Sequence, residues 1–77
     1  MIKSSIFYLD NWGSRCVIYR ADEPNLVIPN IDEMVIFYYK QIPRHFVVKE
    51  RILDYADNVA HLKVELVNSI NIEDLGW

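Results

Sequence analysis

The feature that most limits the possible folds is a strict alternation of apolar and polar residues late in the chain. Between Val59 and Val67 the apolar positions are Ala60, Leu62, Val64 and Leu66, and the polar positions are His61, Lys63 and Glu65. Successive side chains of a β-strand point to opposite faces, so this pattern predicts a strand with one buried face. Residues 48–67 also carry apolar residues at helical spacing. A helix over 48–67 therefore stays open as an alternative, although Asp57 and Asn58 favour a turn there.

Four further segments have the length and the β-branched or aromatic content of strands: Ile2–Leu9, Arg15–Arg20, Glu33–Tyr39 and Phe46–Asp54. The breaks between strands fall at Asp10–Gly13, Ala21–Asn30, Lys40–Arg44 (centred on Pro43) and Tyr55–Asn58. The run Glu33–Tyr39 is almost continuously apolar, which is typical of a strand covered on both faces. Residues Ile70–Trp77 are expected to form a short tail.

Five short strands in 77 residues leave no room for crossover helices. We therefore expect a single all-β domain over residues 1–77, built as a small antiparallel five-stranded meander or SH3-like barrel. The alternative is an α+β fold with a helix over 48–67. Burial and ordering free energies nearly cancel in so short a chain, so self-association or a partner would help its stability.

Cys16 is the only cysteine, so no internal disulfide is possible, and a lone thiol fits a reducing cytoplasm. No apolar run reaches the length of about 18 residues that a membrane span needs, and the first residues lack the pattern of a signal peptide. We therefore expect a cytoplasmic location and no membrane partner.

Catalytic and metal-binding patterns are weak. His45, His61 and Cys16 do not fall at the spacing of zinc ligands, and Cys16 lies in a predicted apolar strand, where a cysteine packs as a small hydrophobe. Adjacent carboxylates, as at Glu73 and Asp74, point to opposite faces of a strand, so they do not form an acid–base pair. Only two glycines are present, too few for a phosphate loop. The sequence predicts no enzyme, no metal and no cofactor.

The segment from Tyr38 to Lys49 carries the strongest candidate binding residues. They are Tyr38, Tyr39, Lys40, Arg44, His45 and Lys49. Tyrosine and arginine anchor protein interfaces, whereas aromatic rings with nearby cations also suit nucleic acid. Residues 39–51 have a local charge of +3, but the whole chain has a net charge of −3, which disfavours nucleic acid. Half-buried tyrosines beside ordinary solvated charges are the third reading of this segment.

Three stretches carry a resemblance: Pro29-Asn30-Ile31-Asp32-Glu33-Met34-Val35, then Phe46-Val47-Val48-Lys49-Glu50-Arg51, then Val64-Glu65-Leu66. Together they are similar to a pattern in many small uncharacterised bacterial and phage proteins with SH3-like barrels. In that pattern a Pro-x-Gly-Asp-x-Val turn opens a strand, and Ile31 stands here in place of the glycine. The resemblance implies a barrel from a phage or mobile element.

Size and resemblance together predict a small free-standing protein–protein interaction module. Its sharpest form would be a phage or mobile-element inhibitor of a host defence enzyme, such as an anti-CRISPR. One alternative is a small β-barrel that binds nucleic acid. Another is a self-assembling structural component, supported by the marginal stability expected of a monomer.

Overall fold

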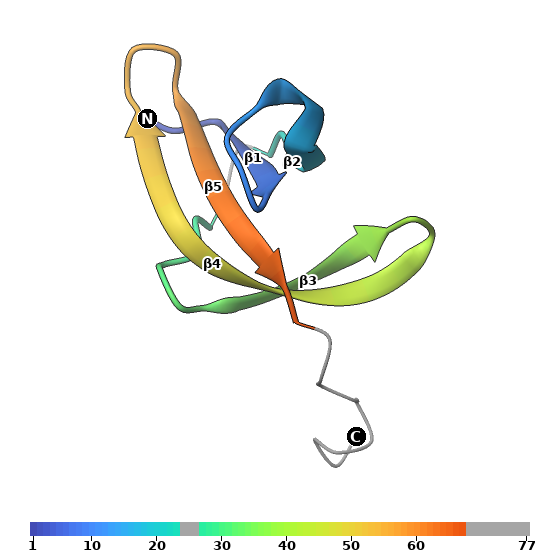
Figure 1. Ribbon diagram of the computed structural model, residues 1–77. Helices are drawn as coiled ribbons and strands as arrows, with labels where there is room; N and C mark the ends of the chain where they lie inside the picture. The colour runs from blue at the N-terminus through green and yellow to red at the C-terminus, as the bar shows by residue number, and fades with distance from the viewer. Residues whose placement is uncertain (24–26, 68–77) are drawn as a thin grey trace.

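The computed structural model describes residues 1–23 and 27–67, which form one five-stranded sheet (Figure 1). The strands are β1 (Ser4–Leu9), β2 (Val17–Ala21), β3 (Met34–Tyr39), β4 (Ile42–Asp54) and β5 (Val59–Leu66). A single 3₁₀ turn, η1 (Ser14–Cys16), comes before β2. This confirms the all-β prediction. The segment expected to be a tail, Ile70–Trp77, lies outside the described residues.

The alternative of a helix over 48–67 is wrong, because β4 and β5 occupy this segment with a turn between them. Asn58 ends the turn with a positive φ of 58°, a left-handed conformation that asparagine adopts more readily than most residues. The Asp54 carboxylate accepts backbone hydrogen bonds from Ala56 and Asp57 and so holds the start of the turn. Local side-chain chemistry thus selects the hairpin over the helix.

The predicted antiparallel meander is wrong at one pairing. The strand order is β2-β1-β5-β4-β3, and β1 pairs antiparallel with β2 but parallel with β5. The parallel register sets Phe7 beside Leu62, and both side chains are buried. Apolar alternation fixes which face of a strand is buried but not the direction of its neighbour. The alternation of apolar and polar residues therefore does not predict that β1 and β5 run parallel.

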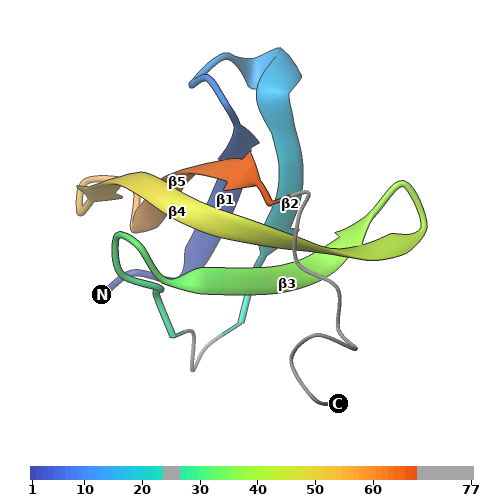
Figure 2. The ribbon, with the colours of Figure 1, turned by 60° about the horizontal axis from the view of Figure 1, so that its bottom comes forward.

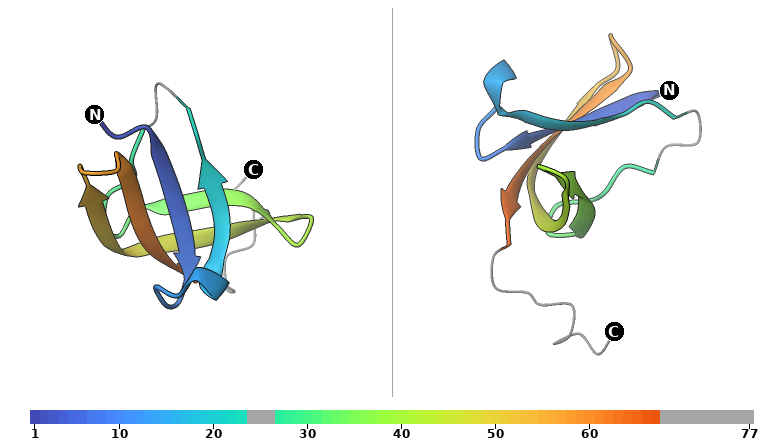
Figure 3. Two further views of the ribbon diagram at one scale, coloured as in Figure 1. Left: turned by 90° about the horizontal axis from the view of Figure 1, so that it is seen from above. Right: turned by 90° about the vertical axis from the view of Figure 1, so that its right-hand side faces the viewer.

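β4 is long enough to pair with two different strands. Its first half pairs with β3 and its second half with β5, and a bulge lies between Val48 and Glu50. A bulge bends its strand and increases the local twist. The sheet curls accordingly, and Figure 3 shows β1 and β2 running across β3 rather than beside it. The result is a half-barrel, consistent with the expected barrel-like fold.

The core fills the inside of this curl. Phe46, Val48, Ala60, Leu62 and Val64 are completely buried. Rings extend the core toward the open side: Phe46 stacks on Phe37 with centroids 4.4 Å apart, and Phe37 stacks on Tyr19 at 4.6 Å. β2 and β3 are the two edges of the sheet, so the Tyr19–Phe37 contact joins them through side chains.

Two predicted boundaries need correction. Arg15 and Cys16 belong to η1, and β2 begins at Val17, so Cys16 is half-buried in a turn rather than in a strand. The predicted break over Lys40–Arg44 is shorter, because Ile42 already belongs to β4 and Pro43 lies opposite Tyr38 in the ladder. Proline is tolerated there because its nitrogen points away from β3, in a part of β4 that does not pair with β5.

The described residues contain no helix of the length and apolarity that a membrane span requires.

Candidate functional site

The hairpin of β3 and β4 extends away from the other strands, as Figures 1 and 2 show. We call the segment Met34–Val47 the arm. Its strands pair in register from Met34 opposite Val47 to Tyr39 opposite Ile42. The turn at its tip therefore contains only Lys40 and Gln41. Because the tip lies beyond the core, its side chains are available for contact on more than one side.

The outer face of the arm is apolar. Alternation along β3 directs Val35, Phe37 and Tyr39 toward the core and the other three side chains outward. These three, which we call the outer row, are Met34, Ile36 and Tyr38, with exposed fractions of 45%, 55% and 70%. Isolated exposed apolar residues are ordinary in proteins, whereas these three follow one another along one face of a strand, which makes the outer row a candidate interaction surface.

Sequence reasoning missed two members of the outer row. The run Glu33–Tyr39 predicted a strand covered on both faces, and this is wrong because the outer face of β3 is exposed. A strand covered on both faces and an edge strand with one exposed apolar face can carry the same apolar composition. The signal that distinguishes them is position, because β3 lies at an edge of the sheet.

Three of the predicted binding residues lie at the end of β3 or at the tip. Tyr38 is on the outer face and strongly exposed. Tyr39 points to the inner face, where its ring meets Phe46 edge-on with centroids 5.9 Å apart. Lys40 is in the turn, and its Nζ lies 5.3 Å from the centre of the Tyr39 ring. Tyr38 and Tyr39 thus serve opposite faces, as adjacent strand residues must.

The other three predicted residues lie along β4. Arg44 is half-buried opposite Phe37 on the inner face. His45 is on the outer side of the ladder but only 7% exposed, and its Nε2 atom has no hydrogen-bond partner among the described residues. Lys49 lies at the bulge, away from the tip, with its Nζ 3.9 Å from the Glu65 carboxylate. The six residues therefore do not form one continuous surface.

The tip has an unusual backbone. Lys40 and Gln41 both have positive φ angles, 52° and 69°. Two consecutive left-handed residues form the two-residue hairpin turn that best matches strand twist, and Asn-Gly is its preferred sequence. A left-handed conformation costs a residue with an ordinary side chain roughly 1–2 kcal/mol. The chain thus keeps two long polar side chains at the tip against a local conformational preference.

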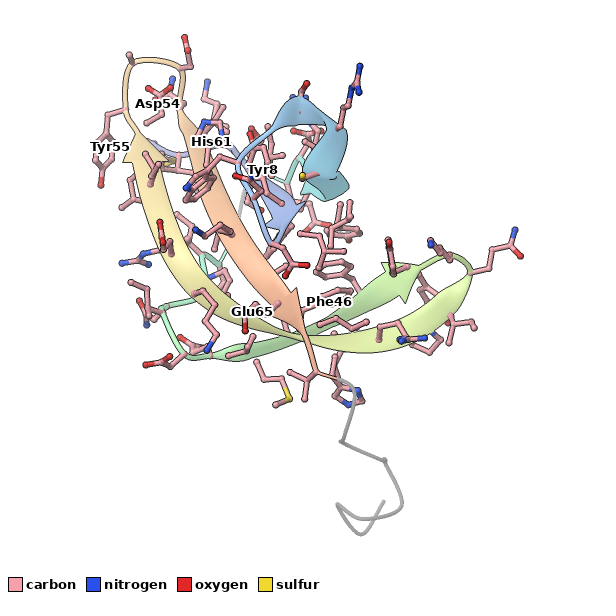
Figure 4. All side chains as sticks on the ribbon, in the orientation of Figure 1. Tyr8, Phe46, Asp54, Tyr55, His61 and Glu65 are labelled. Carbon is pink, nitrogen blue, oxygen red and sulfur yellow. The ribbon has the colours of Figure 1, made fainter. Side chains whose placement is uncertain are left out.

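A second group of polar residues lies on β1, β4 and β5, away from the arm. The Tyr8 hydroxyl and His61 Nδ1 are 2.7 Å apart, and Figure 4 shows these two side chains side by side. The Trp12 ring packs against Tyr8 and lies 5.6 Å from Lys63 Nζ. Lys63 also reaches Glu50 at 2.9 Å and, by this hydrogen bond and its charge, holds the pKa of Glu50 below its ordinary value. Tyr8 is thus paired with His61, and Lys63 with Glu50, which is typical of a structural network.

Within residues 1–23 and 27–67, no three side chains of histidine, cysteine, aspartate or glutamate form a group that could hold a metal ion. A scan of protein-family models and searches of curated proteins and of solved structures find no match to this chain. The resemblance to SH3-like phage proteins therefore stays a prediction. In the turn that carries it, Asp32, the residue after Ile31, has the positive φ of 71°.

Proposed function

We propose that this chain is a protein–protein interaction module and that the arm is its binding element. The observation that carries the proposal is the outer row, Met34, Ile36 and Tyr38, exposed on a projecting hairpin. Ile42 adds a further apolar side chain, 54% exposed, beside the tip. Large apolar and aromatic side chains surrounded by polar groups are the usual anchors of protein interfaces.

The conformation of the tip adds support. Strained backbone is retained where the surrounding structure enforces it, and it clusters at functional sites. Lys40 and Gln41 occupy positions that asparagine and glycine would fill at lower cost. A role for their side chains in binding gives a reason for keeping them.

The positions of the cations favour a protein partner over nucleic acid. Lys49 and Lys63 each lie beside a glutamate, and Arg20 lies 3.0 Å from Asp22. On the arm, Arg44 lies on the inner face, whereas the exposed ring of Tyr38 lies on the outer face. Binding of single strands needs cations along the same groove as the stacking rings, and a net charge of −3 opposes the long-range attraction.

The finer proposal, inhibition of a host defence enzyme such as a CRISPR effector by a phage protein, rests on the resemblance and on the small size of the chain. A projecting hairpin suits this role, because it reaches into a concave site that a flat sheet cannot enter. The cytoplasmic location belongs to the same proposal.

The proposal is tested with the tagged chain as bait in a bacterial lysate, with and without nuclease. Tyr38→Ala removes the most exposed ring of the outer row, and Tyr55→Ala is its matched control, with a tyrosine 66% exposed on the β4–β5 turn. We expect a stoichiometric protein that survives nuclease, is retained by Tyr55→Ala and binds Tyr38→Ala about 30-fold more weakly, as for an interface anchor worth about 2 kcal/mol. Equal binding by both variants would remove the arm from the site. A catch that disappears with nuclease would favour nucleic acid.

A further inference from the structure

Within residues 1–23 and 27–67, β3 has one paired edge and one edge without a neighbouring strand, which we call the free edge. It pairs with β4 and ends the strand order of the sheet. Tyr39 and Ile42 flank a two-residue turn, so they form a hydrogen-bonded pair, and the alternation of an antiparallel ladder then directs every second residue of β3 toward β4. The residues whose N–H and C=O groups point to the free edge are Met34, Ile36 and Tyr38. Among the described residues, these three make no backbone hydrogen bond outside the sheet.

The free edge lacks the features that normally keep edges apart. Proteins protect edge strands with lysine, proline, bulges or inward charges. β3 has the sequence MVIFYY and a regular register, without a charge or a proline. The other edge, β2, carries Arg20, and its pairing with β1 is irregular. β3 is therefore the edge of the sheet that is better suited to pairing with a further strand.

We propose that a second copy of this chain pairs with β3 along this edge, antiparallel, around a two-fold axis at Ile36. In an antiparallel ladder, edge-directed residues pair with edge-directed residues. In the register that uses all three edge-directed residues, Ile36 lies opposite Ile36 of the second copy, and Met34 lies opposite its Tyr38. An interface of this kind is closed and symmetric, so it stops at a dimer.

The charges at the two ends of β3 select this orientation. Asp32 and Glu33 precede the strand and Lys40 follows it. The same register brings Asp32 of each copy to the level of Lys40 of the other, so opposite charges meet at both ends of the interface. A parallel pairing would instead set Asp32 beside Asp32 and Lys40 beside Lys40. The strand is thus self-complementary only in the antiparallel direction.

The inner side of the edge offers space for the added strand. A groove of about 330 Å³ runs between β2 and β3, and Tyr19, Val27, Val35 and Phe37 contribute to its lining. Extending the sheet across the free edge carries the inner-face side chains of the second copy toward this groove. The outer rows of the two copies then lie side by side on one face of the extended sheet. The dimer does not depend on which protein the arm binds.

The first test measures oligomeric state by light scattering and sedimentation at tens of micromolar chain. Ile36→Lys and Ile36→Glu each place two like charges on the two-fold axis, and Ile52→Lys is the matched control at a side chain of similar exposure, 51% against 55%, on β4 away from β3. We expect the wild type and Ile52→Lys to have twice the 9.1 kDa chain mass and each Ile36 variant to have the chain mass. Mixing Ile36→Lys with Ile36→Glu should restore the dimer, because the axis then carries opposite charges.

A monomeric wild type, or an Ile36→Lys variant that stays dimeric, would overturn the proposal. A second measurement uses the Cys16→Ser background, in which Ile36→Cys should form a disulfide-linked dimer on mild oxidation at least ten times faster than Ile52→Cys. Equal oxidation rates for the two cysteine variants would also overturn the proposed dimer.

Tyr38→Ala leaves the edge backbone intact, so loss of the captured protein with a normal dimer mass concerns the proposed function alone. A monomeric wild type that still captures the protein concerns only this inference, whereas the Ile36 variants are judged by mass alone, because Ile36 also belongs to the outer row.

Discussion

Replacing the tip residues with Asn-Gly should stabilise the protein. Lys40 and Gln41 have φ angles of 52° and 69°, and each left-handed residue costs roughly 1–2 kcal/mol, or about 2–4 kcal/mol together. Lys40→Asn combined with Gln41→Gly removes most of this cost. Part of the gain is lost, because glycine gives up about 0.5–1 kcal/mol more conformational entropy on folding. The contact of Lys40 with the Tyr39 ring, worth about 0.5 kcal/mol at an exposed site, is lost as well. We expect a net gain of about 1–2 kcal/mol.

Urea unfolding followed by circular dichroism measures this gain. A small domain has an m-value of about 1 kcal/mol per molar urea, so the midpoint should rise by about 1–2 M. The control is Tyr55→Asn with Ala56→Gly, which introduces the same dipeptide at two turn positions without positive φ. The control should gain nothing and lose up to about 1 kcal/mol through glycine. Equal midpoints for wild type and the tip variant would refute the assignment of strain to the tip.

Two further predictions concern the core and the pH response. Phe46→Leu loses ring contacts with Phe37 and Tyr39, each worth about 0.5–1.5 kcal/mol, so the free energy of unfolding in urea should fall by about 1–3 kcal/mol; a fall below about 0.5 kcal/mol would contradict the stacked core. For Glu50, whose pKa is lowered in the fold by Lys63, the stabilisation exists above the ordinary pKa of 4.5 and is lost as pH falls through the lowered value. Glu50→Gln should therefore lower the urea midpoint at pH 7 but not at pH 2, and an equal decrease at both values would exclude this pair as the cause.

Periodicity predicted most of the fold. The alternation around Leu62 located β5 and its buried face, and Asp57 and Asn58 located the turn before it. The strand direction of β1 could not be predicted, because side-chain alternation is identical for parallel and antiparallel neighbours. Pro43 predicts a break because proline lacks a backbone N–H, but whether a neighbouring strand needs a donor at this position shows only in the assembled sheet.

The candidate site was predicted in part. Composition predicted Tyr38 and Lys40 as candidate binding residues, and the structure places Tyr38 exposed on β3 and Lys40 in the turn at the tip. It did not distinguish Tyr38 from Tyr39, whose faces depend on register. Ile36 was assigned to a covered face because apolar residues signal burial whether the cover belongs to the same chain or to another. Whether a strand lies at an edge of the sheet depends on the order of all the strands, so the local sequence of β3 does not predict it.

The parallel pairing of β1 with β5 also sets how the chain folds. Tyr8 and His61 touch across 53 residues of sequence, and closing a loop of this length costs about 3.5 kcal/mol of chain entropy before any contact repays it. The β3–β4–β5 hairpins close over much shorter distances, so we expect them to form first and β1 to insert beside β5 late. During synthesis the β1–β2 segment is made before β3, β4 and β5, but β1 cannot pair with β5 until β5 has been made. Until β5 is made, Phe7 cannot pack beside Leu62, so we expect the nascent chain to expose apolar surface that the folded sheet buries.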